Sequence, residues 1–257
     1  MGQGLQGVFI FILGLLIGSF LNVCIYRYIR QEQVTTGSSR CPHCETPLRA
    51  VDLVPLLSYL WLGGKCRFCW SSISPRYFIG ELITGIIFYL AFTQIGWNPA
   101  LIKFLTFFSI LIVISGIDIE KGIIPNKLVM VLGGWVIVWQ ITFPDVYPGV
   151  TIWQALAGAF IGSGFLFFVA LISKGKMGGG DIKLMLPAGF FLGPSMTALA
   201  IFLAALVGSV VGIGLMVFKI KGRKDPIPFG PFLSAGIFIA SLWGNQLVAW
   251  YVLQIVA

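Results

Sequence analysis

Four of the five cysteines form two close pairs in one polar stretch of the chain. Two residues separate Cys41 from Cys44, 21 residues follow, and two residues then separate Cys66 from Cys69. Pairs at this distance can place four thiolates at the corners of a tetrahedron, the geometry that Zn²⁺ takes in structural sites. The spacing predicts a structural zinc site, with two disulfides, free thiols or a redox centre as the alternatives.

Two aspartates adjoin long apolar runs and could act together as an acid and a base. Asp118 lies at the end of one run, and Asp181 follows the glycine triplet 178–180. Taken singly, Asp118 would be an interfacial carboxylate and Asp181 a helix N-cap. A triplet exceeds what a cap needs, and it permits unusual backbone angles and the close approach of another segment. Paired at one membrane face, an ionised carboxylate could activate water while its protonated partner polarises a carbonyl.

The composition indicates that these residues belong to a membrane protein. Of the 257 residues, 58% are hydrophobic and 10% are charged, and the mean hydropathy is +0.95. A soluble domain has about 25% charged residues, so the chain lacks the polar surface of a soluble globule. Its hydrophobicity also excludes a disordered chain. The sequence predicts an all-α, polytopic transmembrane helical bundle.

Apolar runs indicate about eight membrane crossings. The run 182–192 carries Pro187 and is barely long enough to span, so we expect a short or broken span there. The runs cover residues 5–26, 77–96, 101–117, 128–143, 152–173, 182–192, 196–218 and 232–255. With eight crossings, every one of the 17 Lys and Arg residues except Lys103 falls on one side.

This charge bias predicts the orientation of the chain. Loops rich in Lys and Arg stay in the cytoplasm, so the cysteine loop and both aspartates are expected to face the cytoplasm. A cytoplasmic loop is kept reducing, which favours zinc over disulfides. The net charge of +8 then needs no nucleic acid as a partner, and contact with anionic membrane lipid is an expected addition.

Three polar side chains near apolar runs have structural interpretations. Glu81 is costly inside a span and is expected to pair with a cation such as Arg76. Lys183 is expected to extend toward the membrane surface as an ordinary snorkelling lysine, with a place beside the aspartates as the alternative. Asn22 is expected to hydrogen-bond to another helix.

The order and spacing of short motifs along nearly the whole chain resemble the type IV prepilin peptidases, which are GxGD-type membrane aspartic proteases. Each motif is weak alone, whereas the combination is highly specific. The motifs are Gly18-Ser-Phe-Leu-Asn-Val23 with Arg27, both cysteine pairs, Ser58-Tyr-Leu60 with Gly64-Lys-Cys66, Ser74-Pro-Arg-Tyr77 with Glu81, Asp118 with Ile124-Pro125, Gly178-Gly-Gly-Asp-Ile-Lys183 and Pro228-Phe-Gly-Pro231.

The resemblance implies a bifunctional enzyme of the bacterial inner membrane. Such proteins cut the basic leader of type IV prepilins or pseudopilins after a glycine, at the cytoplasmic face. They then N-methylate the new terminal residue, usually Phe, with S-adenosylmethionine. By position, Asp118 and Asp181 match the catalytic pair, and the four cysteines match the set of bifunctional members. Residues expected to support the pair or the substrate are Gly178, Gly179, Gly180, Lys183 and Glu81. No motif assigns the methyl-donor site.

The resemblance also suggests a division of the chain. We expect a first transmembrane helix over residues 1–27, a four-cysteine zinc loop over 28–76 and an aspartic peptidase core over 77–257. The chain departs from the family pattern at Asn126, where Asp is frequent, and at Asp52-Leu53, where Asp-Asn is frequent. Neither departure removes a catalytic group, but the second lies near the supposed methylation region.

Two functions from other classes compete with this interpretation. An ion-coupled transporter with a structural zinc loop would also have broken helices and intramembrane acids. The acids here cluster at one face, however, and no inverted repeat is visible. A membrane-anchored zinc-knuckle interaction module would need one crossing instead of eight.

Overall fold

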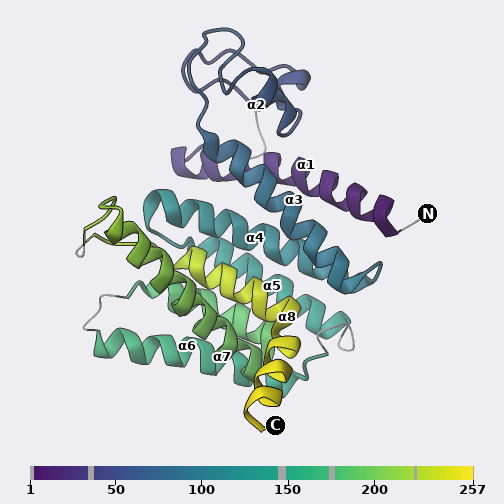
Figure 1. Ribbon diagram of the computed structural model, residues 1–257, viewed down its shortest axis with the longest axis vertical. Helices are drawn as coiled ribbons and strands as arrows, with labels where there is room; N and C mark the ends of the chain where they lie inside the picture. The colour runs from purple at the N-terminus through teal and green to yellow at the C-terminus, as the bar shows by residue number, and fades with distance from the viewer. Residues whose placement is uncertain (1–2, 34–37, 144–148, 174–176, 223–224, 257) are drawn as a thin grey trace. The chain divides into compact units, whose positions relative to one another are not determined.

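The computed structural model describes residues 3–33, 38–143, 149–173, 177–222 and 225–256, and the regular elements in these ranges are helices (Figure 1). The predicted all-α class is confirmed. The chain packs as two units, residues 1–109 and 110–257. Four basic residues of the topology argument, Lys174, Lys176, Arg223 and Lys224, lie outside the described residues.

Six helices in the described ranges are long and apolar enough to cross a membrane. They are α1 (Gln3–Arg30), α3 (Pro75–Ile95), α4 (Pro99–Lys121), α6 (Ile152–Ile172), α7 (Gly179–Val217) and α8 (Gly230–Val256). A seventh apolar helix, α5 (Asn126–Thr142), is shorter.

Helix α7 explains the prediction of a short or broken span. Its 39 residues are interrupted at Gly193, which has a φ of 73°, and Pro194 follows directly. A positive φ is compatible with glycine, and proline lacks the N–H that would continue the helix. When α5 and both halves of α7 are counted, the described chain has the eight apolar segments that the sequence indicated.

In the first unit, α1 and α3 lie side by side (Figure 1). A Cβ at Gly14 of α1 would come within 2.8 Å of Gly85 Cα on α3. Small residues let membrane helices approach this closely. Asn22 Nδ2 donates a hydrogen bond to the Tyr77 carbonyl at 2.9 Å, which confirms the interhelical bond predicted for Asn22. The intervening loop carries the 3₁₀ helix η1 (Ala50–Leu53) and the short helix α2 (Leu57–Trp61).

In the second unit, α7 packs against both α6 and α8 (Figure 1). Gly158 of α6 lies against Gly189 of α7, and a side chain at either position would overlap the opposing backbone. Ser115 Oγ of α4 donates to Ser234 Oγ of α8 at 2.8 Å. These contacts join α6 to α7 and α4 to α8, and α4 and α7 carry the two aspartates.

Candidate active site and cysteine cluster

Asp118 lies in the last turn of α4, at the point where the helix stops. Gly122 has a φ of 66°, and its N–H donates to the Asp118 carbonyl at 2.8 Å, a common helix ending. The Asp118 side chain is buried, and its Oδ2 accepts a hydrogen bond from the Gly230 N–H at 3.0 Å. A Cβ at Gly230 would lie 2.7 Å from this oxygen, so the first residue of α8 must be small.

Asp181 is the third residue of α7 and does not cap the helix. The N-cap is Gly178, which has a φ of −67°, and no side chain caps the helix. The unusual backbone angles expected for the triplet are not found, because none of residues 178–180 has a positive φ. The expected close approach is present at Gly180, where a Cβ would lie 2.8 Å from Ile124 Cβ.

The structure brings Asp118 and Asp181 together at one end of the second unit. Ile124 packs against Gly180, next to Asp181, and also against Gly230, which binds Asp118. The two aspartates are 5% and 6% exposed, and they are close enough for the charge of Asp118 to influence Asp181. Two buried carboxyl groups with mutual influence can divide the roles of acid and base.

One oxygen of Asp181 is available for chemistry. Among the described residues, Asp181 Oδ1 is one of two buried side-chain N or O atoms without a hydrogen-bond partner. Such atoms are rare because an unpaired buried polar group is unfavourable. This oxygen could accept a hydrogen bond from a water molecule or from a bound peptide.

Lys183 connects two helix beginnings. Its Nζ donates to Asn126 Oδ1 at 3.1 Å, so the start of α7 is tied to the start of α5. The side chain is exposed, as a snorkelling lysine would be. Asn126 is one of the two departures from the family pattern, and it keeps an oxygen that this lysine can bind.

Glu81 has partners that its sequence position did not suggest. Its Oε2 accepts a hydrogen bond from the Leu56 N–H at 2.9 Å, and the Ser19 side chain also bonds to the carboxylate. Leu56 has a φ of 59°, an uncommon angle for leucine, and this turn aims its N–H at Glu81. The predicted pairing of Glu81 with a cation such as Arg76 stays a prediction.

The four loop cysteines form one cluster in the first unit. Their sulfur atoms all lie within 4.8 Å of one another, and Cys41 Sγ is 3.8 Å from Cys69 Sγ. Ligands at the Zn–S distance of about 2.3 Å would be about 3.8 Å apart at the corners of a tetrahedron. None of the five cysteines, all of them described, forms a disulfide. The donor set and its spacing therefore fit a tetrahedral metal ion.

The two cysteine turns have the same backbone pattern. The Cys41 N–H donates to the Thr46 carbonyl at 3.1 Å, and the Cys66 N–H donates to the Ser71 carbonyl at 2.9 Å. In each turn the residue after the second cysteine has a positive φ, 55° in the first and 58° in the second. Isolated β-bridges close both turns. Two equivalent turns can thus each present a pair of sulfurs to one ion.

Hydrogen bonding also prepares one thiol for metal binding. The Ser71 hydroxyl lies 3.0 Å from Cys69 Sγ. Hydrogen bonds with the Ser71 hydroxyl, and then with its backbone, lower the pKa of the Cys69 thiol to about 6. A thiol with such a pKa is largely thiolate at neutral pH, which is the form that binds metals.

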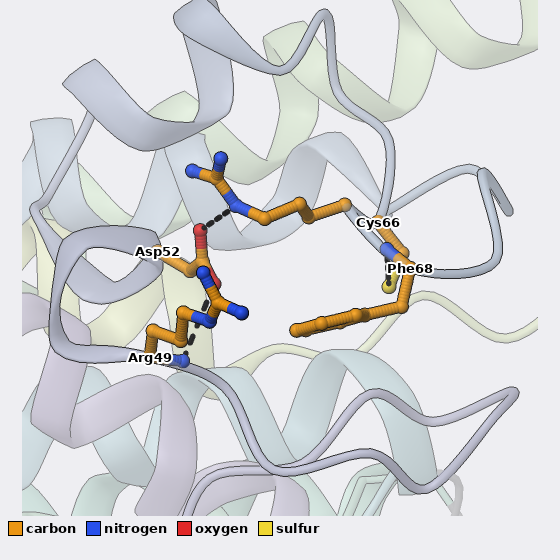
Figure 2. A network of polar contacts seen from close by, with 5 residues as sticks. Arg49, Asp52, Cys66 and Phe68 are labelled. Carbon is orange, nitrogen blue, oxygen red and sulfur yellow. Dashed lines mark hydrogen bonds and ion pairs between the residues drawn. The ribbon is translucent and has the colours of Figure 1, made fainter.

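Asp52 ties η1 to the second cysteine turn, as Figure 2 shows from close by. Its Oδ1 accepts a hydrogen bond from Arg67 Nε at 2.7 Å, and its Oδ2 accepts one from the Arg49 N–H at 3.2 Å. The Arg49 guanidinium lies over the ring of Phe68, 5.6 Å from its centre. Arg67 and Phe68 are the two residues between Cys66 and Cys69, so this network orients that turn.

Comparison with known proteins agrees with this division into two sites. Residues 12–95 match the family model of the bacterial peptidase A24 N-terminal domain, and residues 105–213 match that of the type IV leader peptidase family. The cysteine cluster falls in the first match, and both aspartates fall in the second.

Relatives of similar length extend over nearly all of the chain. The prepilin leader peptidase/N-methyltransferase of Aeromonas hydrophila is 33% identical over 94% of this chain and 92% of its own length. The protein of the same name from Bacillus subtilis is 33% identical over 95% of this chain and 96% of its own length. The one from Neisseria gonorrhoeae is 34% identical over 93% of this chain and 92% of its own length. No solved structure matches.

The chain therefore belongs to the type IV leader peptidase family. It is accordingly a multi-pass bacterial membrane enzyme, a peptidase and N-methyltransferase. Several residues that build its sites were not identified from the sequence by role, namely Gly230, Ile124, Ser71 and Leu56. The Pro228-Phe-Gly-Pro231 motif was the available signal for Gly230.

Proposed function

We propose that the protein removes the leader of type IV prepilins or pseudopilins and then N-methylates the new terminus. The observation that carries the peptidase assignment is the burial of Asp118 and Asp181 at one end of the second unit, with Asp181 Oδ1 unpaired among the described residues. The printed names of the relatives support the substrate class.

The proposed cleavage uses both carboxyl groups. The ionised member takes a proton from water, and the water oxygen bonds to the carbonyl carbon of the scissile peptide. The protonated member donates a hydrogen bond to the carbonyl oxygen. The carbon–nitrogen bond then breaks, and the leaving amine takes up the proton that the first carboxyl group had accepted from water. The hydrogen bond from Gly230 holds Asp118 in a fixed orientation throughout.

The position of the pair suits a substrate that lies partly in the membrane. Asp118 lies in the last turn of α4, four residues before Gly122, and Asp181 lies in the first turn of α7. Both carboxyl groups are thus at helix ends. The apolar segment of a precursor could lie in the bilayer while its basic leader stays in the cytoplasm, and we propose that the active site faces that compartment of the inner membrane.

We further propose that Cys41, Cys44, Cys66 and Cys69 hold a structural Zn²⁺. Such an ion would join two turns that are separated by 21 residues of loop. A small loop region with few buried apolar side chains gains much of its order from a metal of this kind. S-adenosylmethionine, the proposed methyl donor, would supply the methyl group that the new terminal amine accepts.

Incubation of the purified protein in detergent with a prepilin peptide, read by mass, tests this function. We expect loss of the leader with or without S-adenosylmethionine, and the gain of a single methyl group only when S-adenosylmethionine is present. An intact peptide under both conditions would contradict the peptidase assignment. Cleavage without methyl gain would contradict the methyltransferase assignment.

A further inference from the structure

A cavity of about 560 Å³ lies in the first unit, beside the cysteine cluster. Small-molecule sites commonly have about 300–1,000 Å³. Its walls come from the second half of α1, from η1 and α2, from both cysteine turns and from the first turns of α3. The cavity is thus large enough for a cofactor, and it lies within the N-terminal family domain.

The cavity gathers motif residues that the peptidase chemistry does not use. The family resemblance of the first unit rests on short motifs in α1, in the loop and in α3. The residues of these motifs that line the cavity include Ser19, Asn22, Arg27, Ser58, Tyr59 and Glu81. The proposed peptidase pair lies in the second unit, and no step of the proposed cleavage assigns a role to these residues.

The lining matches the parts of S-adenosylmethionine. Tyr59 and Phe78 offer aromatic faces for a flat base, and their ring centres are 5.4 Å apart. Arg30 is available for a carboxylate, and Glu32 for an amino group or a ribose diol. The buried Glu81 carboxyl group lines the cavity, where it could face the sulfonium cation. The residues present therefore fit the proposed methyl donor.

Glu81 is the most informative of these residues. It is 9% exposed, and the Leu56 N–H and the Ser19 side chain hold it in place. These two hydrogen-bond donors are neutral, and a buried carboxylate is further stabilised by a cation. A cationic ligand in the cavity would supply that charge.

We propose that this cavity binds S-adenosylmethionine, with the Glu81 carboxylate facing the sulfonium. The assignment rests on the proposed methyltransferase function. It also gives the cysteines a role, because Cys41 and Cys66 line the cavity and a bound zinc would hold its wall. Loss of zinc would then disturb methyl-donor binding directly.

A pair of neighbouring tryptophan substitutions tests the location. Ser58 lines the cavity, whereas Leu57 is 65% exposed and does not line it. We expect Ser58→Trp to weaken the binding of S-adenosylmethionine and of its neutral product S-adenosylhomocysteine by about tenfold or more. Leu57→Trp should bind both as the wild type does. Equilibrium dialysis on the full-length protein in detergent measures these affinities, and circular dichroism with a thermal unfolding profile like that of the wild type shows that each variant is folded.

A charge substitution tests the orientation. Glu81→Gln keeps the shape and an oxygen for the Leu56 N–H but removes the charge. We expect it to weaken the binding of S-adenosylmethionine by about tenfold or more, because interactions between ionised groups are stronger than those between neutral groups. Binding of S-adenosylhomocysteine should change about threefold or less, because its sulfur is neutral. Equal losses for both ligands would overturn the sulfonium contact.

The outcomes separate this proposal from the function on which it rests. If the wild type binds S-adenosylmethionine and methylates peptide, and Ser58→Trp does so equally well, the cavity assignment is wrong and the proposed function stands. If the wild type neither binds S-adenosylmethionine nor methylates, the proposed methyltransferase function fails first. Selective loss of binding in Ser58→Trp supports the cavity.

Discussion

The cysteine cluster and the aspartate pair are assembled in opposite ways. The cluster takes its four ligands from two similar turns, between Cys41 and Cys69, in one loop. The pair needs the end of α4 and the beginnings of α7 and α8, and Asp118 and its partner Gly230 are 112 residues apart. Local spacing in the sequence therefore specifies the cysteine cluster, whereas the aspartate pair forms only when distant helices pack together.

This difference predicts which changes break each site. The cluster depends on the identity of its ligands, because only the four thiolates can bind the proposed metal that joins the two turns. The pair depends on small residues at helix contacts, because the backbone must come close for the carboxyl groups to meet. Substitutions in one region should leave the chemistry of the other largely intact.

The largest expected effect is the loss of cleavage in Asp118→Asn and in Asp181→Asn. Either change removes one member of the acid–base pair, which contributes about 100-fold to 10,000-fold in such reactions. Leader removal from a prepilin peptide, followed by mass, should fall by at least this factor, while methylation of a pre-cleaved peptide persists. Asp225→Asn, in an exposed turn where Asp225 binds the Gly222 N–H, is the control. Full cleavage by either active-site variant would refute the pair.

Cys41→Ser should impair methylation more than leader cleavage, the reverse of the effect expected for the aspartate variants. Losing one of four ligands should weaken zinc binding by at least the roughly 10–100-fold that the loss of an outer-shell partner causes. We expect methylation to fall with metal content, as measured by elemental analysis, and cleavage to fall much less. Cys24→Ser, in α1 and not one of the four clustered cysteines, is the matched control. Unchanged zinc in the Cys41 variant would count against the metal site.

Gly230→Ala should impair cleavage without touching a carboxyl group. The added Cβ would lie 2.7 Å from Asp118 Oδ2, so the carboxylate must move. Misplacement by about 1 Å can lower a rate about 100-fold, and we expect a loss of 10–100-fold in kcat/KM. Gly164→Ala is the control, because a Cβ there meets no atom within 4 Å. Equal rates for both variants would show that Gly230 does not position Asp118.

The smallest expected effect is that of Asn126→Asp. This change would convert the hydrogen bond with Lys183 into an exposed ion pair, for which about 0–1 kcal/mol of added stability is typical. The midpoint temperature of thermal unfolding in detergent should rise slightly, and the rate of leader cleavage should stay the same. The rise should vanish in a Lys183→Met background. A rise that persists there would assign the effect to another contact.

Sequence patterns were sufficient for the fold class, the apolar segments and the cysteine cluster, because each depends on composition or on local spacing. The interhelical bond of Asn22 was also predicted, since an amide inside a span needs a partner. The donors to Asp118 and Glu81 were not predicted. Gly230 and Leu56 contribute backbone N–H groups, and which backbone group faces a carboxylate depends on packing between distant segments.

The break in α7 was also predicted only in part from the sequence. Pro187 and the short length of the run 182–192 indicated a short or broken span, but the position of the break, at Gly193 with its positive φ, was not predicted. Of the two features expected for the glycine triplet, one was confirmed and one was not. Its close approach was predicted correctly, and its unusual backbone angles were not found.

An experimental structure in lipid, with a peptide that spans the cleavage site, would measure the separation of the Asp118 and Asp181 carboxyl oxygens. If the pair activates one water molecule, an oxygen from each group must lie about 3 Å from it. The nearest oxygens should then be at most about 6 Å apart. A larger separation with peptide bound would contradict the proposed mechanism.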